Sequence, residues 1–446
     1  FDLAKAAAAV FEQNPQVEGL VLHKHGVFTF GATAREAYER MIAHVTRAEM
    51  RLARGRRPVF QATALPAENA PVSALAPIIR GACAIPAAGP GEPGRFVLDF
   101  RNSPRTLDFV RAANLAAVSQ RGVVTPDHII RTKNFPLLLP VAEPGRLADF
   151  TRSAQEAVAR FASDYDAMFA RQNARVGGIK TKLDPRPRVV LVAGVGLFGL
   201  GATPKDARIA ADLGETAIDV ITDAEAIGTF EALGEADLFD LEYWSLEQAK
   251  LKGAKTFPFT GQIIAITGGA GGIGRATARA FAAEGASVAV LDRDGDAAMT
   301  VAKAIGGIGL ACDVTDRPSV EAAFARICET WGGLDILVSN AGAAWQGRIG
   351  EVSDEILRKS FELNFFAHQR VAQAATRIML AQGTGGCLLF NVSKQAVNPG
   401  PNFGPYGLPK AATLFLVRQY ALDYGAEGIR ANGVNADRIR SGLLTD

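Results

Sequence analysis

The sequence predicts an α/β protein whose C-terminal part, residues 258–446, is a doubly wound parallel sheet. Two observations support this prediction. After Pro258 and Gly261 the chain alternates between short apolar strands, glycine-containing turns and helices, which is the pattern of βαβ units. Before that junction strands and helices are also expected, but in a less regular order. We therefore expect a region 1–60, a connecting α/β region 61–257 and the parallel-sheet domain 258–446.

The composition excludes several classes of function. The 48 basic and 46 acidic residues leave a net charge of +2, so no nucleic-acid surface is expected. The longest apolar run, "VVLVAGVGLFGLGA" from Val189, is too short and too rich in glycine to cross a bilayer. The four cysteines show no metal-ligand spacing, which favours reduced thiols in the cytoplasm. We expect a cytoplasmic protein with a small-molecule substrate and no membrane partner.

The first region predicts a hairpin followed by a helix. "VEGLVLHKHGVFTFG" contains two short strands joined at Lys24, His25 and Gly26, and "TAREAYERMIAHVTRAEMRLARG" is an amphipathic helix. The chain starts without Met and inside a predicted helix, so we expect the natural protein to begin earlier.

The middle region predicts a strand at "GRFVLDF", a helix at "TLDFVRAANLAAVSQRG" and a long helix ending in "DAMFARQ". It also contains G-x-G-x-x-G from Gly194 to Gly199, but "AIDVITDAEAIG", which follows, reads as a helix and not as a strand ending in an acid. We therefore expect a structural turn there, not a nucleotide site. Asp127 and His128 could form an acid/base pair, although a hydrogen-bonded loop is the interpretation we favour.

The strongest signal for a cofactor lies in "QIIAITGGAGGIGRATARAFAAEGASVAVLDRD". A buried strand runs into a glycine turn, Gly268 to Gly274, which opens a helix. Glycines let the backbone approach a pyrophosphate, and the helix N-terminus offers N–H groups to it. Asp292 lies 24 residues after Gly268, where a carboxylate can accept hydrogen bonds from ribose hydroxyls. Asp292 favours NAD because it repels the extra phosphate of NADP, whereas Arg293 could bind that phosphate or simply be solvated.

Tyr406 and Lys410 are one helical turn apart, and Ser393 precedes Tyr406 by 13 residues. A hydride transfer at carbon requires a proton transfer at oxygen, which Tyr406 could perform as acid/base. Lys410 would lower the pKa of Tyr406 through its positive charge. Alternatively, Tyr406 is a core aromatic and Lys410 a solvated residue. The cofactor turn and Ser393 make us prefer catalysis.

Residues 260–446 resemble the short-chain dehydrogenase/reductase family, whose sheet is of the Rossmann type. The resemblance implies that the cofactor contacts Thr267, Gly268, Gly272, Ile273, Gly274, Asp292, Asp313, Val314, Asn340, Ala341, Gly342, Tyr406 and Lys410. It also implies that Tyr406 is the acid/base beside Lys410, that Ser393 binds the substrate oxygen, that Asn364 holds a water, and that the protein forms dimers or tetramers. Two features depart from the family: Asn435-Ala436-Asp437 stands where many members have Pro-Gly, and the chain stops at Asp446, where the family continues.

The segment "VEGLVLHKHGVFTFGATAREAYERMI" resembles the end of a class II (zinc) aldolase domain, which implies His25 as a metal ligand. A zinc site needs at least three protein ligands, and His25 is the one good candidate, so zinc is expected only if a complete aldolase domain is present. "TPDHIIRTK" (125–133) and "FDLEYWSLEQAKL" (239–251) resemble the connecting region of bifunctional aldolase/short-chain dehydrogenases. That family cleaves a ketose 1-phosphate such as rhamnulose 1-phosphate to lactaldehyde, which the dehydrogenase half oxidises.

Three functions follow from these observations. The leading one is an NAD-dependent oxidoreductase of a small hydroxy-aldehyde, alcohol or polyol in deoxysugar breakdown. The alternative is a zinc-dependent class II aldolase with a secondary dehydrogenase half. The third is a non-catalytic nucleotide-binding module, against which Ser393, Tyr406 and Lys410 argue.

Overall fold

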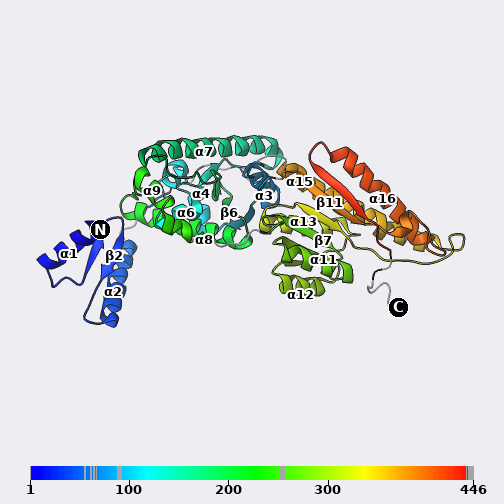
Figure 1. Ribbon diagram of the computed structural model, residues 1–446, viewed down its shortest axis with the longest axis horizontal. Coiled ribbons are helices and arrows are strands. Elements are labelled where there is room, and N and C mark those ends of the chain that lie inside the picture. The colour runs from blue at the N-terminus through cyan, green and yellow to red at the C-terminus, as the bar shows by residue number, and fades with distance from the viewer. Residues whose placement is uncertain are drawn as a thin grey trace.

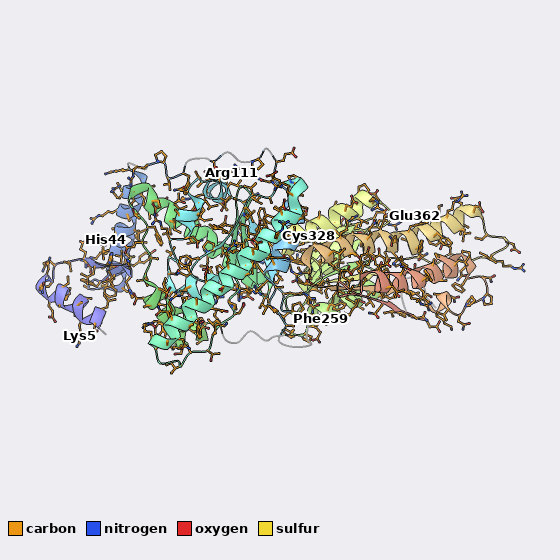
Figure 2. The ribbon with its side chains drawn as sticks, turned by 90° about the horizontal axis from the view of Figure 1, so that it is seen from above. Lys5, His44, Arg111, Phe259, Cys328 and Glu362 are labelled. Carbon is orange, nitrogen blue, oxygen red and sulfur yellow. The ribbon has the colours of Figure 1, made fainter. Side chains whose placement is uncertain are left out.

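The computed structural model describes residues 2–54, 57–60, 63, 66, 68–87, 93–251, 257–437 and 439. These residues form three parts that follow one another along the long axis of the molecule (Figure 1, and from above in Figure 2). The first part contains a two-stranded sheet, the middle part a four-stranded sheet and the C-terminal part a six-stranded sheet. Among the described residues, no helix has the length and apolar character needed to span a bilayer. The α/β class predicted from the sequence is confirmed.

The first part is a hairpin packed against helices. Its strands pair antiparallel around a turn in which Lys24 has a positive φ of 58°. Thr33 caps the helix that follows by accepting a hydrogen bond from the backbone of Glu36. The predicted two strands and helix are confirmed as β1 (Gly19–Leu22), β2 (Gly26–Thr29) and α2 (Ala34–Ala53), preceded by α1 (Asp2–Gln13).

The middle part contains a four-stranded sheet with the order β3-β6-β5-β4. The pair β4–β5 is parallel, and the pairs β5–β6 and β3–β6 are antiparallel. Its strands are β3 (Val97–Arg101), β4 (Leu137–Leu139), β5 (Val189–Val192) and β6 (Gly196–Gly201). Its helices are α3 (Val72–Ala82), α4 (Pro104–Val110), α5 (Leu115–Ser119), α6 (Pro126–Thr132), η1 (Pro144–Arg146), α7 (Leu147–Arg175), α8 (Pro204–Ile227), α9 (Glu235–Glu242) and α10 (Ser245–Ala249). Strand β3 and the long helix α7 confirm two of the predicted elements of this region.

The glycine pattern from Gly194 to Gly199 is a hairpin. Strands β5 and β6 pair antiparallel on either side of it, and Gly194 and Gly196 have φ angles of 75° and 151°. These angles favour glycine because it has no Cβ. The expectation of a structural turn is confirmed.

The predicted helix over residues 106–122 is wrong in one respect, because the structure divides it into α4 and α5. The carbonyl of Val110 accepts a hydrogen bond from Gly194 at 3.1 Å, and that of Arg111 accepts one from Thr63 at 3.1 Å. In a continuous helix these two carbonyls would accept from backbone N–H groups four residues later. Here they accept from Gly194 and Thr63 instead.

The C-terminal part is a parallel sheet with the order β12-β11-β10-β7-β8-β9, as the doubly wound prediction requires. Its strands are β7 (Ile263–Thr267), β8 (Ser287–Asp292), β9 (Ile308–Ala311), β10 (Ile336–Ser339), β11 (Gly386–Asn391) and β12 (Ile429–Val434). Its helices are α11 (Gly272–Ala283), α12 (Gly295–Ile305), α13 (Arg317–Trp331), α14 (Asp354–Phe361), the π-turn η2 (Glu362–Phe366), α15 (Ala367–Gln382), η3 (Lys394–Ala396) and α16 (Gly404–Tyr424).

Helices cover both faces of this sheet. Ile263 and Ala265 of β7 belong to a core shared with α13, α15 and α16, whereas Ile264 and Ile266 face α11 and α12. Alternate side chains of a strand point to opposite faces, so every position of β7 is buried. This explains why the strands read as unbroken apolar runs. Because the chain order reverses between β7 and β10, their carboxyl ends border a crevice.

A buried ion pair joins the middle and C-terminal parts. Arg80 of α3 donates to both carboxylate oxygens of Asp335, at 2.9 and 2.6 Å, and the two side chains are 2% and 1% exposed. Arg95 lies 3.1 Å from the same carboxylate, which also accepts from the backbone of Ile263 at 2.7 Å. Helix α3 packs against α13 and α15 at this junction (Figure 1). The two parts therefore share a buried interface.

Candidate active site

The glycine turn after β7 brings the first turn of α11 against the strand end. Gly268 has a φ of 60°, and a Cβ on Gly274 would lie 2.3 Å from the Gly268 carbonyl oxygen. Gly272, Ile273 and Gly274 form the first turn of α11. The turn is therefore a tight backbone cradle at a helix N-terminus, the geometry suited to a pyrophosphate.

Two acidic residues lie at the ends of the next two strands. The carboxylate of Asp292, the last residue of β8, accepts hydrogen bonds from the backbone of Ala270 at 3.0 Å and Asp294 at 3.2 Å. Asp313, after β9, accepts from the side chain and backbone of Thr315 at 2.6 and 2.9 Å, and these bonds lower the pKa of its carboxyl. The adjacent Val314 is buried in the core. Asp292 thus lies directly beside the glycine turn.

Hydrogen bonds tie the ends of β7, β10 and β11 together. Thr267 Oγ1 accepts from the backbone of Asn340 at 2.9 Å and of Ala341 at 3.1 Å. Asn340 Nδ2 donates to the carbonyls of Thr267 and Gly268, and its Oδ1 accepts from Asn391 at 3.0 Å. These hydrogen bonds hold the ends of the three strands in place where the cofactor crevice is expected.

Asn364 is completely buried in the π-turn between α14 and α15. Its Nδ2 donates to the Ala343 carbonyl at 2.8 Å and Ser360 Oγ at 3.2 Å, and its carbonyl accepts from Thr413 at 2.7 Å. Its Oδ1 has no hydrogen-bond partner among the described residues, and a Cβ on Gly342 would lie 3.0 Å from it. π-turns often occur at functional sites.

Ser393 and Tyr406 meet at the carboxyl end of β11. Ser393 caps η3, where its Oγ accepts from the backbone of Gln395 at 3.2 Å, and Tyr406 lies in the first turn of α16. Burial raises the pKa of Tyr406, while a hydrogen bond with Ser393 acts in the opposite direction. The lowered pKa expected for Tyr406 is thus not found in this structure, because burial is the larger effect.

Lys410 lies one turn after Tyr406, with its Nζ 5.8 Å from the centre of the Tyr406 ring. It is 2% exposed, and its Nζ donates to the Asn391 carbonyl at 2.8 Å. Burial lowers the pKa of Lys410 to about 7. Lys410 is therefore a buried amine at the site and not a solvated helix residue.

These residues converge on the carboxyl edge of the parallel sheet. A family model described as short chain dehydrogenase matches residues 262–446. Sorbitol dehydrogenase of Cereibacter sphaeroides is 37% identical over 177 residues, which cover 39% of this chain and 69% of the relative. The chain belongs to the short-chain dehydrogenase family.

The preceding parts match aldolase families. The class II aldolase and adducin N-terminal domain model covers residues 2–52, and the model for the second domain of class II aldolase covers residues 70–251. The uncharacterized oxidoreductase YuxG of Bacillus subtilis is 32% identical over 461 residues, covering 99% of this chain. The chain spans 65% of the length of YuxG. The chain thus joins a short-chain dehydrogenase domain to preceding parts that match class II aldolase domains.

A solved 3-ketoacyl-(acyl-carrier-protein) reductase from Brucella melitensis, complexed with NADH, is 27% identical to this chain. The match has a TM-score of 0.41 and covers 42% of this chain and 79% of that one.

His368 is a site residue that the sequence reasoning missed. It is 2% exposed on α15, its Nε2 is 3.2 Å from Lys410 Nζ, and its Nδ1 is 2.6 Å from Ser339 Oγ. Burial, and then the nearby Lys410 charge, lower the pKa of His368 well below its usual value. The signal was its position one helical turn after Asn364, which places both side chains on one helix face.

The loop after β12 replaces the family's Pro-Gly and is attached to η3. The Ala436 carbonyl accepts from the backbone of Lys394 at 2.9 Å, and Asp437 pairs with the Lys394 side chain at 3.0 Å. Residues 440–446 lie outside the described part of the chain.

His25 lies apart from these residues, exposed in the turn between β1 and β2. Its backbone N–H donates to the Leu22 carbonyl at 2.9 Å. Among the described residues no three His, Cys, Asp or Glu side chains gather as metal ligands. The surroundings of His25 in this part of the chain do not fit a zinc site.

Proposed function

We propose that the C-terminal part is an NAD-dependent dehydrogenase of a small hydroxy-aldehyde, alcohol or polyol, with Tyr406 as the acid/base. The observation that supports this most is the pairing of the Ser393 and Tyr406 hydroxyls beside the buried amine of Lys410. A substrate oxygen between the two hydroxyls would accept from Ser393 and exchange a proton with Tyr406.

The backbone around the crevice fits a dinucleotide. A Cβ on Gly274 would meet the Gly268 carbonyl, so the cradle at the start of α11 depends on glycine. Gly268, Gly272, Ile273 and Gly274 would hold the pyrophosphate, Asp313 and Val314 the adenine, and Thr267, Asn340, Ala341, Gly342, Tyr406 and Lys410 the nicotinamide half. The bound nicotinamide would accept or donate the hydride.

Asp292 supports NAD over NADP. Its carboxylate lies at the glycine turn, where it would accept hydrogen bonds from ribose hydroxyls and repel an additional phosphate. The exposed neighbour Arg293 offers the opposite charge, which makes the preference a matter for measurement.

Lys410 and Asn364 would serve proton transfer at Tyr406. A protonated Lys410, with its Nζ 5.8 Å from the centre of the ring, would stabilise tyrosinate by its positive charge. The unpartnered Oδ1 of Asn364 lies beside Gly342, where it would order a water molecule next to Lys410. Protons released by Tyr406 would leave the buried site along these groups.

The similarity to a sorbitol dehydrogenase favours a polyol or a small hydroxylated carbonyl compound as substrate. The class II aldolase domains that precede the C-terminal part favour a lactaldehyde-like aldehyde from deoxysugar breakdown as the substrate. An aldolase that cleaves a ketose 1-phosphate releases such an aldehyde. The described residues around His25 contain no set of ligands for zinc, so they do not support the zinc-dependent aldolase function. We derive no step through zinc.

Replacing Tyr406 with Phe tests the proposal. The ring stays and only the hydroxyl is lost, so we expect cofactor binding to persist and turnover with NAD to fall by a factor on the order of 100 or more. Tyr420→Phe is the matched control, because Tyr420 is a buried tyrosine of the same helix whose hydroxyl bonds to Gln369 at 3.0 Å outside the site. Reduced-nicotinamide absorbance reports the rate with a panel of aldehydes and polyols. Near-normal hydride transfer by Tyr406→Phe would sink the proposal.

A further inference from the structure

Lys133, in the middle part, has a backbone conformation that is normally reserved for glycine. It follows α6 directly, with φ 65° and ψ 174°. This region of backbone space is unfavourable for any residue with a Cβ. The strained carbonyl is held by Thr132 Oγ1, which donates to it at 3.0 Å. Glycine would adopt this conformation without strain. We therefore ask what the side chain of Lys133 contributes at this position.

The Lys133 side chain reaches a buried polar cluster. Its Nζ donates to Glu242 Oε1 at 2.9 Å and lies 4.1 Å above the centre of the Tyr165 ring. Tyr165 donates to the same carboxylate at 3.0 Å and bonds to the Tyr243 hydroxyl at 2.7 Å. Burial lowers the pKa of Lys133, and Glu242 opposes that effect. The charge of Lys133 is thus paired with Glu242, and Lys133 also lines a cavity.

That cavity has a volume of about 190 Å³ and is lined by three cationic side chains, Arg131, Lys133 and Arg188, and by one carboxylate, Asp184. The Asp184 carboxylate is engaged: it accepts from Arg188 at 2.5 Å and from the backbone of Arg186 at 3.0 Å. Glu242 balances Lys133. The side chain of Arg131, which is half-buried, makes no hydrogen bond or ion pair with any described residue. Among the described residues, the lining of the cavity therefore has one positive charge that no carboxylate balances.

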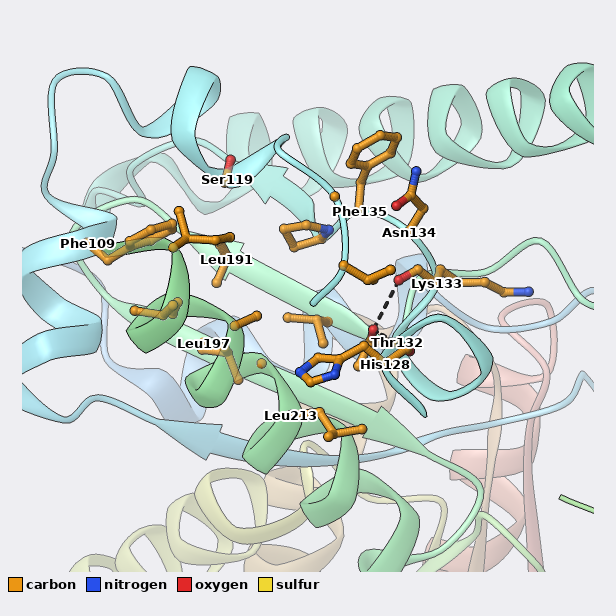
Figure 3. Close-up of a pocket in the computed structure, with 18 residues that line it drawn as sticks. Phe109, Ser119, His128, Thr132, Lys133, Asn134, Phe135, Leu191, Leu197 and Leu213 are labelled. Atoms are coloured by element: carbon orange, nitrogen blue, oxygen red, sulfur yellow. Dashed lines mark hydrogen bonds between the residues drawn. The ribbon is translucent and has the colours of Figure 1, made fainter. Parts of the chain in front are cut away.

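A neighbouring cavity, which is also lined by Lys133, has a different character (Figure 3). It is mostly apolar, with a volume of about 40 Å³, enough for a few water molecules. His128 Nε2 and Asn134 Oδ1 have no hydrogen-bond partner among the described residues. Burial lowers the pKa of His128 more than the Leu213 backbone and Asp127 raise it. His128 Nδ1 bonds to Thr125 at 2.8 Å, and the Asp127 carboxylate pairs with Lys250 at 3.2 Å. No arginine among the described residues lines this cavity, so it offers an anion no guanidinium.

We propose that the cationic cavity around Lys133 binds a small organic anion, either a phosphate monoester or a carboxylate. Arg131 supplies the free guanidinium, whose planar donors match both kinds of oxyanion. Lys133 and Arg188 contribute positive charge from the walls, and the volume admits a molecule of a few carbon atoms with its anionic group. The site is separate from the crevice of the parallel sheet and lies in the part that matches the second domain of class II aldolase.

Calorimetric titration of the full chain tests this site with three probes of similar size: glycerol 3-phosphate, glycerate and uncharged glycerol. We expect saturable binding of at least one anion and none of glycerol. Binding of the phosphate alone identifies a phosphate monoester site, and binding of glycerate alone a carboxylate site. If neither anion binds saturably, the proposal is overturned.

Arg131→Gln removes the free charge from a half-buried position, so the fold should persist. We expect it to weaken anion binding by about tenfold or more, the scale of one charge-assisted hydrogen bond. Arg152→Gln is the control, because Arg152 is an exposed arginine on α7. NAD binding, followed separately, should be the same in both variants. Equal anion affinity in Arg131→Gln and the parent chain would overturn the proposal even if the anion binds.

Discussion

The contact between Lys410 and His368 gives the buried amine an acceptor that carries no charge at neutral pH. Burial and the Lys410 charge both lower the pKa of His368, so its ring is neutral and Nε2 can accept from the Lys410 ammonium. In that tautomer Nδ1 donates to Ser339 Oγ at 2.6 Å. His368 would act through Lys410 and not on the substrate, so it is a positioning residue in the proposed mechanism.

His368→Leu removes this acceptor, and the ammonium form of Lys410 loses a hydrogen bond. The pKa of Lys410, now about 7, should fall further, so less positive charge remains near Tyr406 at a given pH. Tyrosinate is then less stable, and the rising limb of the rate of alcohol oxidation against pH should move to higher pH. A pH profile of kcat measures this shift.

His368→Gln is the matched variant, since its amide oxygen can accept a hydrogen bond in the same place. We expect its profile to lie closer to that of the parent chain. A purely structural role would lower the rates of both variants without moving either pH limb, and that result would contradict the assignment.

Asp292 is expected to set the cofactor preference. Asp292→Ala removes a ribose acceptor and a repulsive charge, so NAD should bind more weakly and NADP relatively better. The ratio of kcat/KM for NAD and NADP should shift toward NADP by about tenfold. Asp296→Ala, in the first turn of α12, is a control that also removes one negative charge. An unchanged NAD preference in Asp292→Ala would mean that another residue selects the cofactor.

The positions of the site residues could be predicted from the sequence because they follow strand ends or share a helix turn. Carboxyl ends of parallel strands meet at one edge, which brings Asn340 against Asn391, two residues before Ser393, although they are far apart in the chain. The direction of the pKa shift of Tyr406 could not be predicted, since it depends on burial by residues distant in sequence. His368 escaped notice because one-turn spacing alone is a common pattern.

At the scale of elements, the approach of α11 to β7 depends on the absence of a side chain at Gly274. In Gly274→Ala the new Cβ would meet the Gly268 carbonyl oxygen at 2.3 Å and Gly269 Cα at 2.7 Å. Both are backbone atoms, so the helix has to move. We expect a loss of about 1–3 kcal/mol in the free energy of unfolding and weaker NAD binding. Gly350→Ala, where a Cβ meets nothing within 4 Å, is the control. Denaturant titration and cofactor fluorescence distinguish the two variants.

The elements of the parallel sheet were predictable because each strand and helix is a local apolar pattern with glycine turns between them. The division between α4 and α5 was not predictable, because it depends on a hydrogen bond to Val110 from Gly194, which lies in the β5–β6 hairpin, far away in the sequence. The same limit applies to Lys133, whose positive φ no sequence rule for lysine would suggest.

At the scale of the whole molecule, Asp335 is the carboxylate on which the junction of the middle and C-terminal parts depends. Asp335→Ala would leave Arg80 and Arg95 buried beside each other without that carboxylate. Breaking such a buried pair costs about 3–5 kcal/mol. Thermal unfolding should report this loss, whereas Asp149→Ala, which removes an exposed carboxylate on α7, should change the stability little. If Asp335→Ala unfolds at the temperature of the parent chain, the junction contributes little to stability.

Asp335 directly precedes β10, and Asn340 directly follows it, so a single strand runs from the inter-part ion pair to the floor of the cofactor crevice. The interface is therefore part of the frame that holds the crevice, and we expect it to keep the two parts associated without a covalent link. A protease site engineered into residues 252–256 should yield two fragments that migrate together on a sizing column and retain the NAD affinity of the uncut chain. The same cut in an Asp335→Ala background should release the fragments from each other and weaken NAD binding with them.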